Sequence, residues 1–90
     1  MKPILTKTET TTCDGNEVTL VGEVFDEPIK KSQNYLIYSH IKILNDRGEM
    51  FHPGFSFPAI MTEHELDSEL AFYKKSMNEN PKAYLKQIGK

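Results

Sequence analysis

This sequence has few of the residues and patterns that reveal a chemical function. Cys13 is its one cysteine, so an internal disulfide cannot form. A lone thiol is typical of a reducing compartment, and we expect a cytoplasmic protein. No apolar run approaches the roughly 18 residues of a membrane span, and the N-terminus soon turns polar, so neither a membrane helix nor a signal peptide is expected.

Arginine is almost absent as well, with Arg47 as the one example among eleven basic residues. Arginine is the usual reader of guanine edges and the usual bidentate partner of phosphate, so base-specific DNA recognition is disfavoured. Charges of both signs are mixed, with a net charge of −2 and a pI near 5.9. A general polyanion binder would be clearly basic.

The sequence also lacks the motifs of common active sites. The five glycines are isolated, which excludes a glycine-rich phosphate loop, and no Gly-x-Ser-x-Gly elbow is present. His40, His52 and His64 stand apart from one another, whereas zinc ligands usually come in close pairs. We therefore predict no catalytic residue, no metal site and no cofactor, and we do not expect an enzyme.

The positive information is a change of hydrophobic period. Up to Phe57 apolar residues recur mostly at every second position, which predicts strands, and from Thr62 onward they recur every third or fourth, which predicts helices. Asp14-Gly15 is typical of a hairpin turn, and 26–34 is polar enough to be the longest loop. The expected strands cover approximately residues 3–12, 17–25, 34–44 and 49–57.

The helical part has recognisable start signals. Thr62 and Glu65 form a capping-box pattern, and Leu66, Leu70, Tyr73 and Met77 follow as one apolar stripe. Asn80 and Pro81 are typical of a second, short helix. This second helix would carry Tyr84, Leu85 and Ile88 on its apolar side and end at Gly89.

These elements predict one small α+β domain over residues 1–90. We expect a four-stranded antiparallel sheet, mostly a meander, with two C-terminal helices and the first packed on one sheet face. The opposing sheet residues would be Tyr35, Ile37, Ile41, Ile43, Phe55 and Phe57. The other face would carry Leu36, Tyr38, His40 and Leu44, and it is too apolar to face water freely, which is the strongest sequence-level indication of a partner.

The segment 50–61 is unusually rich in phenylalanine, proline and methionine. If buried, it is an edge strand that contributes to the core; if exposed, it is a contact surface. We therefore expect a small cytoplasmic protein-binding module, a regulator or inhibitor that acts by contact with a larger protein. Such a module could act as a homodimer. The candidate contact residues are Leu36, Tyr38, His40, Phe51, Phe55 and Phe57.

Two alternatives stay open. The lysine-rich C-terminal stretch could bind nucleic acid, with lysines on phosphates and a tyrosine stacked on a base. Its candidate residues are Lys74, Lys75, Lys82, Tyr84 and Lys86. The second alternative is a small-ligand protein or an enzyme without a recognisable motif, which a cluster of Glu23, Tyr38 and His40 on one sheet face would favour. No membrane partner is expected.

Overall fold

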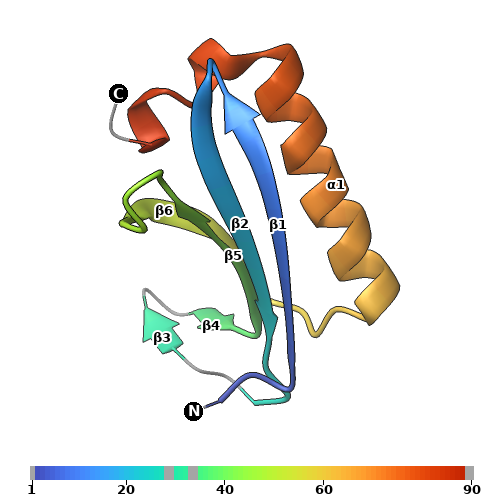
Figure 1. Cartoon of the computed structure of the whole chain (residues 1–90). Helices are drawn as coiled ribbons and strands as arrows, with labels where there is room; N and C mark the ends of the chain where they lie inside the picture. Colours follow the sequence, from blue (N-terminus) through green and yellow to red (C-terminus); the bar gives the residue numbers. More distant parts are fainter. Residues whose placement is uncertain (1, 28–29, 33–34, 89–90) are drawn as a thin grey trace.

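A computed structural model describes residues 2–27, 30–32 and 35–88, with the side chains of 30–32, 35–36, 51–54 and 87 left out of the description. A four-stranded antiparallel sheet runs in the order β1-β2-β5-β6, and β3 and β4 pair in a second, two-stranded sheet (Figure 1). The strands are β1 (Leu5–Cys13), β2 (Asn16–Val24), β3 (Lys30–Ser32), β4 (Tyr35–Ile37), β5 (Ser39–Leu44) and β6 (Met50–Phe57). They are followed by the helix α1 (Glu63–Glu79) and the short 3-10 turns η1 (Pro81–Ala83) and η2 (Lys86–Ile88).

The predicted hairpin turn at Asp14-Gly15 is confirmed. Cys13 pairs with Asn16, so the loop between β1 and β2 has two residues. Both loop residues have positive φ, 52° at Asp14 and 80° at Gly15, which is the backbone of a type I′ turn. This turn matches the right-handed twist of the strands and fixes the register of the first hairpin.

The predicted order of strands is confirmed for the four-stranded sheet. Strand β1 lies at one edge and β6 at the other, with β5 in the interior. A register shift between Ile41 and Ile43 marks an irregularity where β6 pairs with β5. This bulge, together with Pro53 inside β6, explains why that strand suits an edge and not the middle of the sheet.

The predicted strand over 34–44 is wrong in one respect, because the chain bends at Tyr38 and splits it into β4 and β5. The Tyr38 carbonyl accepts a 2.7 Å hydrogen bond from Phe25 N–H, and its own N–H donates to Phe57. These bonds join Tyr38 to the four-stranded sheet, whereas Tyr35 and Ile37 pair with β3 in the small sheet. Strand β3 also lies within the stretch predicted to be a loop.

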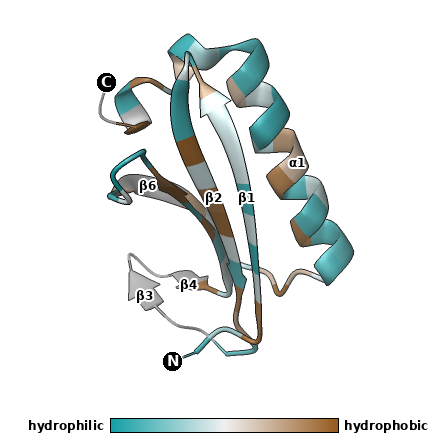
Figure 2. Cartoon of the chain, viewed as in Figure 1, coloured by the Kyte–Doolittle hydropathy of each residue, from teal (hydrophilic) through white to brown (hydrophobic). Residues whose placement is uncertain are grey.

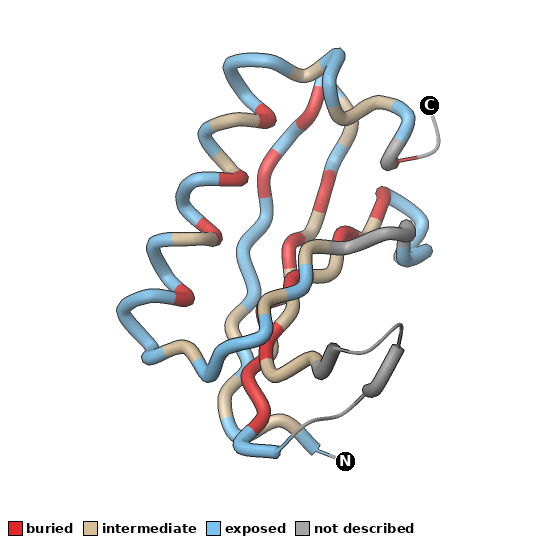
Figure 3. Tube along the Cα trace, turned by 180° about the vertical axis from the view of Figure 1, so that it is seen from behind, coloured by how far each residue is buried: buried red, intermediate tan, exposed pale blue. Residues whose placement is uncertain are grey.

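The helix α1 packs on one face of the sheet, as predicted. Leu66, Leu70, Tyr73 and Met77 are buried on its inner side, and Figure 3 shows these buried positions recurring along the side that faces the strands. They join Val18, Leu20, Val24, Ile41 and Ile43 in one core. The expected capping box is present, since Thr62 and Glu65 bond reciprocally at 3.2 and 3.0 Å.

The second predicted helix is wrong. Residues 81–88 form η1 and η2, two separate 3-10 turns of three residues each. A segment this short closes too few i→i−4 hydrogen bonds to offset helix nucleation, and 3-10 turns are the usual form of such pieces. The predicted packing role survives, because Ile88 is fully buried and Tyr84 and Leu85 pack against the core.

Candidate functional site

The face of the sheet opposite α1 is the main candidate site, and we call it the open face. Side chains alternate along a strand, so residues that neighbour the core-facing positions point to the open face. Within the described residues no helix covers this face. Its members are Thr6, Thr8, Thr10 and Thr12 on β1, Glu17, Thr19, Val21 and Glu23 on β2, His40, Lys42 and Leu44 on β5, and Met50 and Ser56 on β6.

A polar cluster of Glu23, His40 and Lys42 occupies the part of the open face between β2 and β5. His40 Nε2 lies 2.8 Å and Lys42 Nζ 2.7 Å from the same carboxylate oxygen, Glu23 Oε1. The side chains of Glu23 and His40 are 13% and 19% exposed, so they are largely screened from water although they lie on the outer face, whereas Lys42 is 36% exposed. We call these three residues the Glu23 cluster.

Cross-strand register places the Glu23 cluster. Glu23 lies directly opposite His40, and Lys42 lies opposite Val21, the next residue of β2 on the same face. The Phe25 ring adds an apolar wall, with its centroid 5.7 Å from that of the His40 ring. Both nitrogen-bearing side chains can therefore reach one carboxylate without distorting either strand.

Electrostatics keep the Glu23 carboxylate ionised. Burial by itself would raise the pKa of Glu23, but hydrogen bonds from Lys42 and His40 and their positive charge outweigh burial and lower it. The Glu23 carboxylate therefore holds the Lys42 ammonium and the His40 imidazole at hydrogen-bond distance.

The second alternative, a ligand-binding protein or enzyme, would require Glu23, Tyr38 and His40 to cluster, and two of these three side chains are in contact. Glu23 and His40 meet, while the Tyr38 backbone, through its hydrogen bond to Phe25, ties this end of the sheet together. Ser56 lies opposite His40 on β6 and is exposed. A nucleophile needs a hydrogen bond to its base and a pocket for substrate. Among the described contacts, none joins Ser56 to His40.

The six predicted protein-contact residues do not form one surface. His40 lies on the open face and Tyr38 at the bend beside it. Phe55 and Phe57 lie on the opposite, covered face and pack against the core. The side chains of Leu36 and Phe51 lie outside the described residues, although Phe51 pairs with Ile43 through the backbone.

The segment 50–61 is divided between the core and solvent. Phe55 stacks on Tyr73 of α1, with ring centroids 4.1 Å apart, so its ring closes the core at the β6 edge. Met50 and Ile60 at the two ends of the segment are 50% and 51% exposed. The segment is therefore mainly a structural strand whose ends reach the surface.

The predicted nucleic-acid residues are dispersed, and several have partners in the chain. Lys74 Nζ lies 3.6 Å from Glu9, and Lys75 Nζ lies 3.9 Å from Glu79. The Tyr84 hydroxyl hydrogen-bonds to Ser76 at 2.7 Å, and its half-buried ring is thereby fixed against the core. The remaining two candidates, Lys82 and Lys86, are exposed on η1 and η2.

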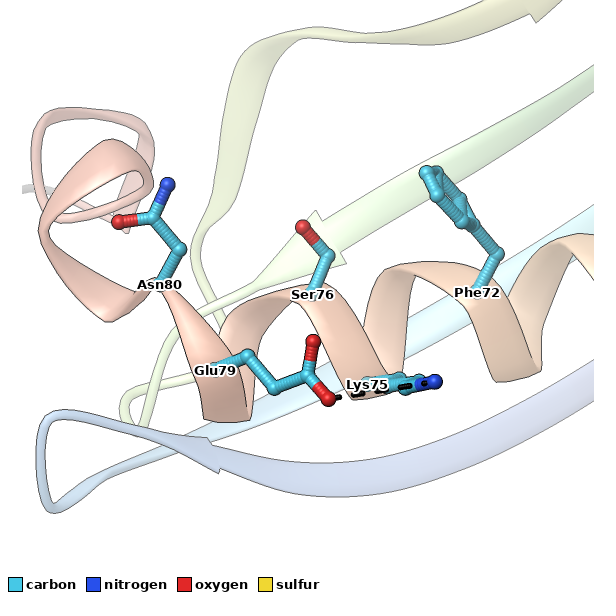
Figure 4. A pocket seen from close by; sticks show the side chains of 5 residues that line it. All are labelled: Phe72, Lys75, Ser76, Glu79 and Asn80. Atoms are coloured by element: carbon cyan, nitrogen blue, oxygen red, sulfur yellow. Dashed lines mark ion pairs between the residues drawn. The ribbon is translucent and has the colours of Figure 1, made fainter.

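A shallow pocket of about 260 Å³ lies along the outer side of α1 near its C-terminal end (Figure 4). Its lining follows helical spacing, and the Phe72 ring is 57% exposed at one end. The Lys75–Glu79 pair neutralises its charge, so it offers no concentrated binding chemistry. The lining residues are Phe72, Lys75, Ser76, Glu79 and Asn80.

The single thiol is built into the structure. Cys13 is fully buried, and its Sγ donates to the Pro81 carbonyl at 3.3 Å. Burial raises the pKa of the Cys13 thiol, and the charge of Asp14 raises it further, so the thiolate form is disfavoured. Across the described residues, no group of three or more histidine, cysteine or acidic side chains is arranged to hold a metal ion.

Lys42 is a site residue that the sequence pattern does not predict, and Glu23 is predicted only as a conditional member of a cluster. The two belong to strands separated by β3 and β4, and only the register of β2 against β5 brings them together. Alternation along each strand was the available signal, since it places Glu23, His40 and Lys42 on the face away from the core positions. Alternation gives the face of each residue, but only the strand register shows which residues of two strands lie opposite each other.

Comparisons of this chain with protein-family models, with curated proteins and with solved structures find no match. In the described part of the chain, no helix is long and apolar enough to cross a membrane.

Proposed function

We propose that this chain is a small protein-binding module that acts as a regulator or inhibitor through contact with a larger protein. The open face is the binding surface. The observation that carries the proposal is the one-sided covering of the sheet: α1 packs on one face, and the other presents half-buried Val21, His40 and Leu44 to its surroundings.

The chemistry of the open face supports a protein partner. Its centre combines apolar side chains with the fixed charges of the Glu23 cluster, and its β1 side carries four exposed threonines. Protein interfaces commonly combine a small apolar centre with polar groups that fix orientation. Because the Glu23 cluster is already hydrogen-bonded, little side-chain freedom is lost when a partner covers it.

The nucleic-acid alternative has weaker support. Lys74 and Lys75 lie within ion-pair distance of acids of this chain, and the Tyr84 ring packs against the core. A phosphate would have to compete with those carboxylates, and a base could not stack on both faces of a ring that already packs against the core. Binding of this kind would weaken steeply with salt.

Affinity capture from the host lysate tests the proposal, with three forms of the chain and with and without nuclease. Val21→Arg places a charge in the middle of the open face, between Thr8 and Lys42 in the cross-strand register. Lys75→Glu is the control, a charge change outside the open face, on the exposed side of α1. Circular dichroism verifies that each form is folded.

We expect one stoichiometric protein that survives nuclease, is retained by Lys75→Glu and is lost with Val21→Arg. A partner that binds all three forms equally would use another surface, which contradicts the open-face assignment. Recovery that disappears with nuclease, and falls with Lys75→Glu, would support the nucleic-acid alternative instead.

A further inference from the structure

The two edges of the four-stranded sheet differ in a way that points to a partner for one of them. Strand β6 contains Pro53 and a register irregularity, both of which hinder pairing with another strand. Strand β1 pairs with β2 through nine consecutive residues without a shift, and it contains no proline. No strand in the described part of the chain occupies its outer side.

The hairpin turn determines which backbone groups of β1 point outward. In a two-residue hairpin the residues that flank the loop, here Cys13 and Asn16, form a hydrogen-bonded pair, and such pairs recur at every second residue. The odd-numbered residues of β1 therefore bond to β2. The outward N–H and C=O groups belong to Thr6, Thr8, Thr10 and Thr12.

The sequence of β1 is self-complementary around Thr8. If a second copy pairs antiparallel with Thr8 opposite Thr8, outward groups meet outward groups, and Thr6 lies opposite Thr10. The same register puts Lys7 opposite Glu9 twice, once on each side of the two-fold axis. Threonine pairs and opposite charges are favourable cross-strand neighbours.

The neighbouring registers are less favourable. Pairing centred on Glu9 places two carboxylates opposite each other, and pairing centred on Lys7 does the same with two ammonium groups. A shift that puts Thr8 opposite Glu9 or Lys7 is also unfavourable. It places the outward backbone groups of one β1 opposite backbone groups of the other β1 that already bond to β2. The register centred on Thr8 is therefore selected by both charge and hydrogen bonding.

The charges of helix α1 are also compatible with this two-fold arrangement. Lys7 pairs with Glu63 and Asp67, Glu9 pairs with Lys74, and Asn78 donates to Thr11, so α1 follows β1 in the same direction. A two-fold axis at Thr8 reverses one helix relative to the other. The acidic first half of each helix then lies on the side of the basic second half of its partner.

We propose that the partner of the β1 edge is a second copy of this chain, joined by antiparallel β1–β1 pairing centred on Thr8. The dimer has one continuous eight-stranded sheet with both α1 helices on the same side. This pairing uses the edge, not the open face, so it holds or fails independently of the function proposed above. A chain of 90 residues gains stability from the added burial.

Sedimentation equilibrium of the full chain, from micromolar to millimolar concentration, tests the dimer. We expect the mass to rise from the 10.3 kDa of one chain to twice that value. Lys7→Glu and Glu9→Lys, each alone, place like charges opposite each other and raise the dimer dissociation constant roughly tenfold. An equimolar mixture of these two variants restores opposite charges and recovers the dimer.

A second pair of variants acts on the backbone and does not depend on the charges. Thr8→Pro removes an outward N–H that bonds to nothing within the sheet of one chain, so it abolishes the dimer while leaving the monomer folded. Thr8→Val keeps the N–H and keeps the dimer. Circular dichroism monitors folding in every variant.

Three outcomes would overturn the proposal. The first is a wild-type chain that remains monomeric at millimolar concentration. The second is a dimer that persists in Thr8→Pro. The third is a mixture of the two charge variants that associates no better than either variant alone.

Discussion

The two faces of the four-stranded sheet are stabilised by different forces, although the same strands supply both. On the covered face, Leu20, Ile41 and Ile43 are fully buried in the core that α1 joins, and the stabilisation comes from removal of apolar surface from water. On the open face, the fixed contacts are the hydrogen-bonded charges of the Glu23 cluster. Figure 2 shows the related contrast along the chain, with hydrophobic bands on β2 and mostly pale or hydrophilic colour on β1.

Burial and exposure are therefore properties of a face of this sheet and not of a strand. Glu23 and Val24 are neighbours in β2, yet one holds a polar cluster and the other is a fully buried core residue. The loss of folding stability caused by a substitution should therefore depend on the face on which the residue lies.

The largest expected effect comes from truncation in the covered face. Leu66 is fully buried, so Leu66→Ala should lower the free energy of unfolding by about 2–5 kcal/mol. Leu44→Ala, on the half-buried open face, should cost about 1 kcal/mol. Urea denaturation of both variants measures the two losses, and equal losses would show that the two faces are stabilised alike.

The next effect concerns Gly22, where α1 approaches the sheet closely. A Cβ added at Gly22 would lie 2.6 Å from Leu66 Cδ1, so Gly22→Ala should destabilise the fold by about 1–3 kcal/mol. In the Leu66→Ala background the clashing atom is absent, and the same change should cost less. A double-mutant cycle measures this coupling, and strict additivity would mean that the helix shifts freely.

The smallest of the three effects tests the open face through its pH dependence. Glu23→Gln removes the charge that Lys42 and His40 share and should cost about 1–2 kcal/mol near neutral pH. Because folding lowers the pKa of Glu23 from 4.5, the stabilisation is present above that value and is lost as pH falls through the folded-state pKa.

The curves of stability against pH for wild type and Glu23→Gln should therefore converge in acid. Glu17→Gln is the matched control, since Glu17 lies on the same face of β2 but is exposed. Its curve should follow that of the wild type. A Glu23→Gln loss that stays constant down to the lowest pH would show that the cluster contributes through packing and not through charge.

Much of the fold could be predicted from local patterns. The two-residue turn at Asp14-Gly15, the capping box at Thr62 and the apolar stripe of α1 are all written in consecutive residues, and all are present. The bend at Tyr38 was not predictable in this way. It depends on hydrogen bonds from Phe25 and to Phe57, two residues that are remote in sequence.

The candidate site was less predictable than the fold. Alternation along the strand predicts that His40 lies on the face away from the core. The composition of 50–61 adds Phe55 and Phe57 to the contact candidates, but they lie on the other face, which their own alternation also predicts. Alternation assigns a side to each residue within one strand. It cannot say which sides of two strands coincide until the register is known, and the partnership of Glu23 with Lys42 depends on that register.

The contacts between β1 and the C-terminal part of the chain delay the formation of the core during folding. Lys7 meets Glu63, Thr11 meets Asn78 and Cys13 meets Pro81, across 56, 67 and 68 positions of sequence. Contacts between residues so far apart require loop closure before they stabilise anything, and they slow folding. On the ribosome the β1–β2 hairpin can form early, but its apolar face stays exposed to water until α1 and Pro81 have been synthesised.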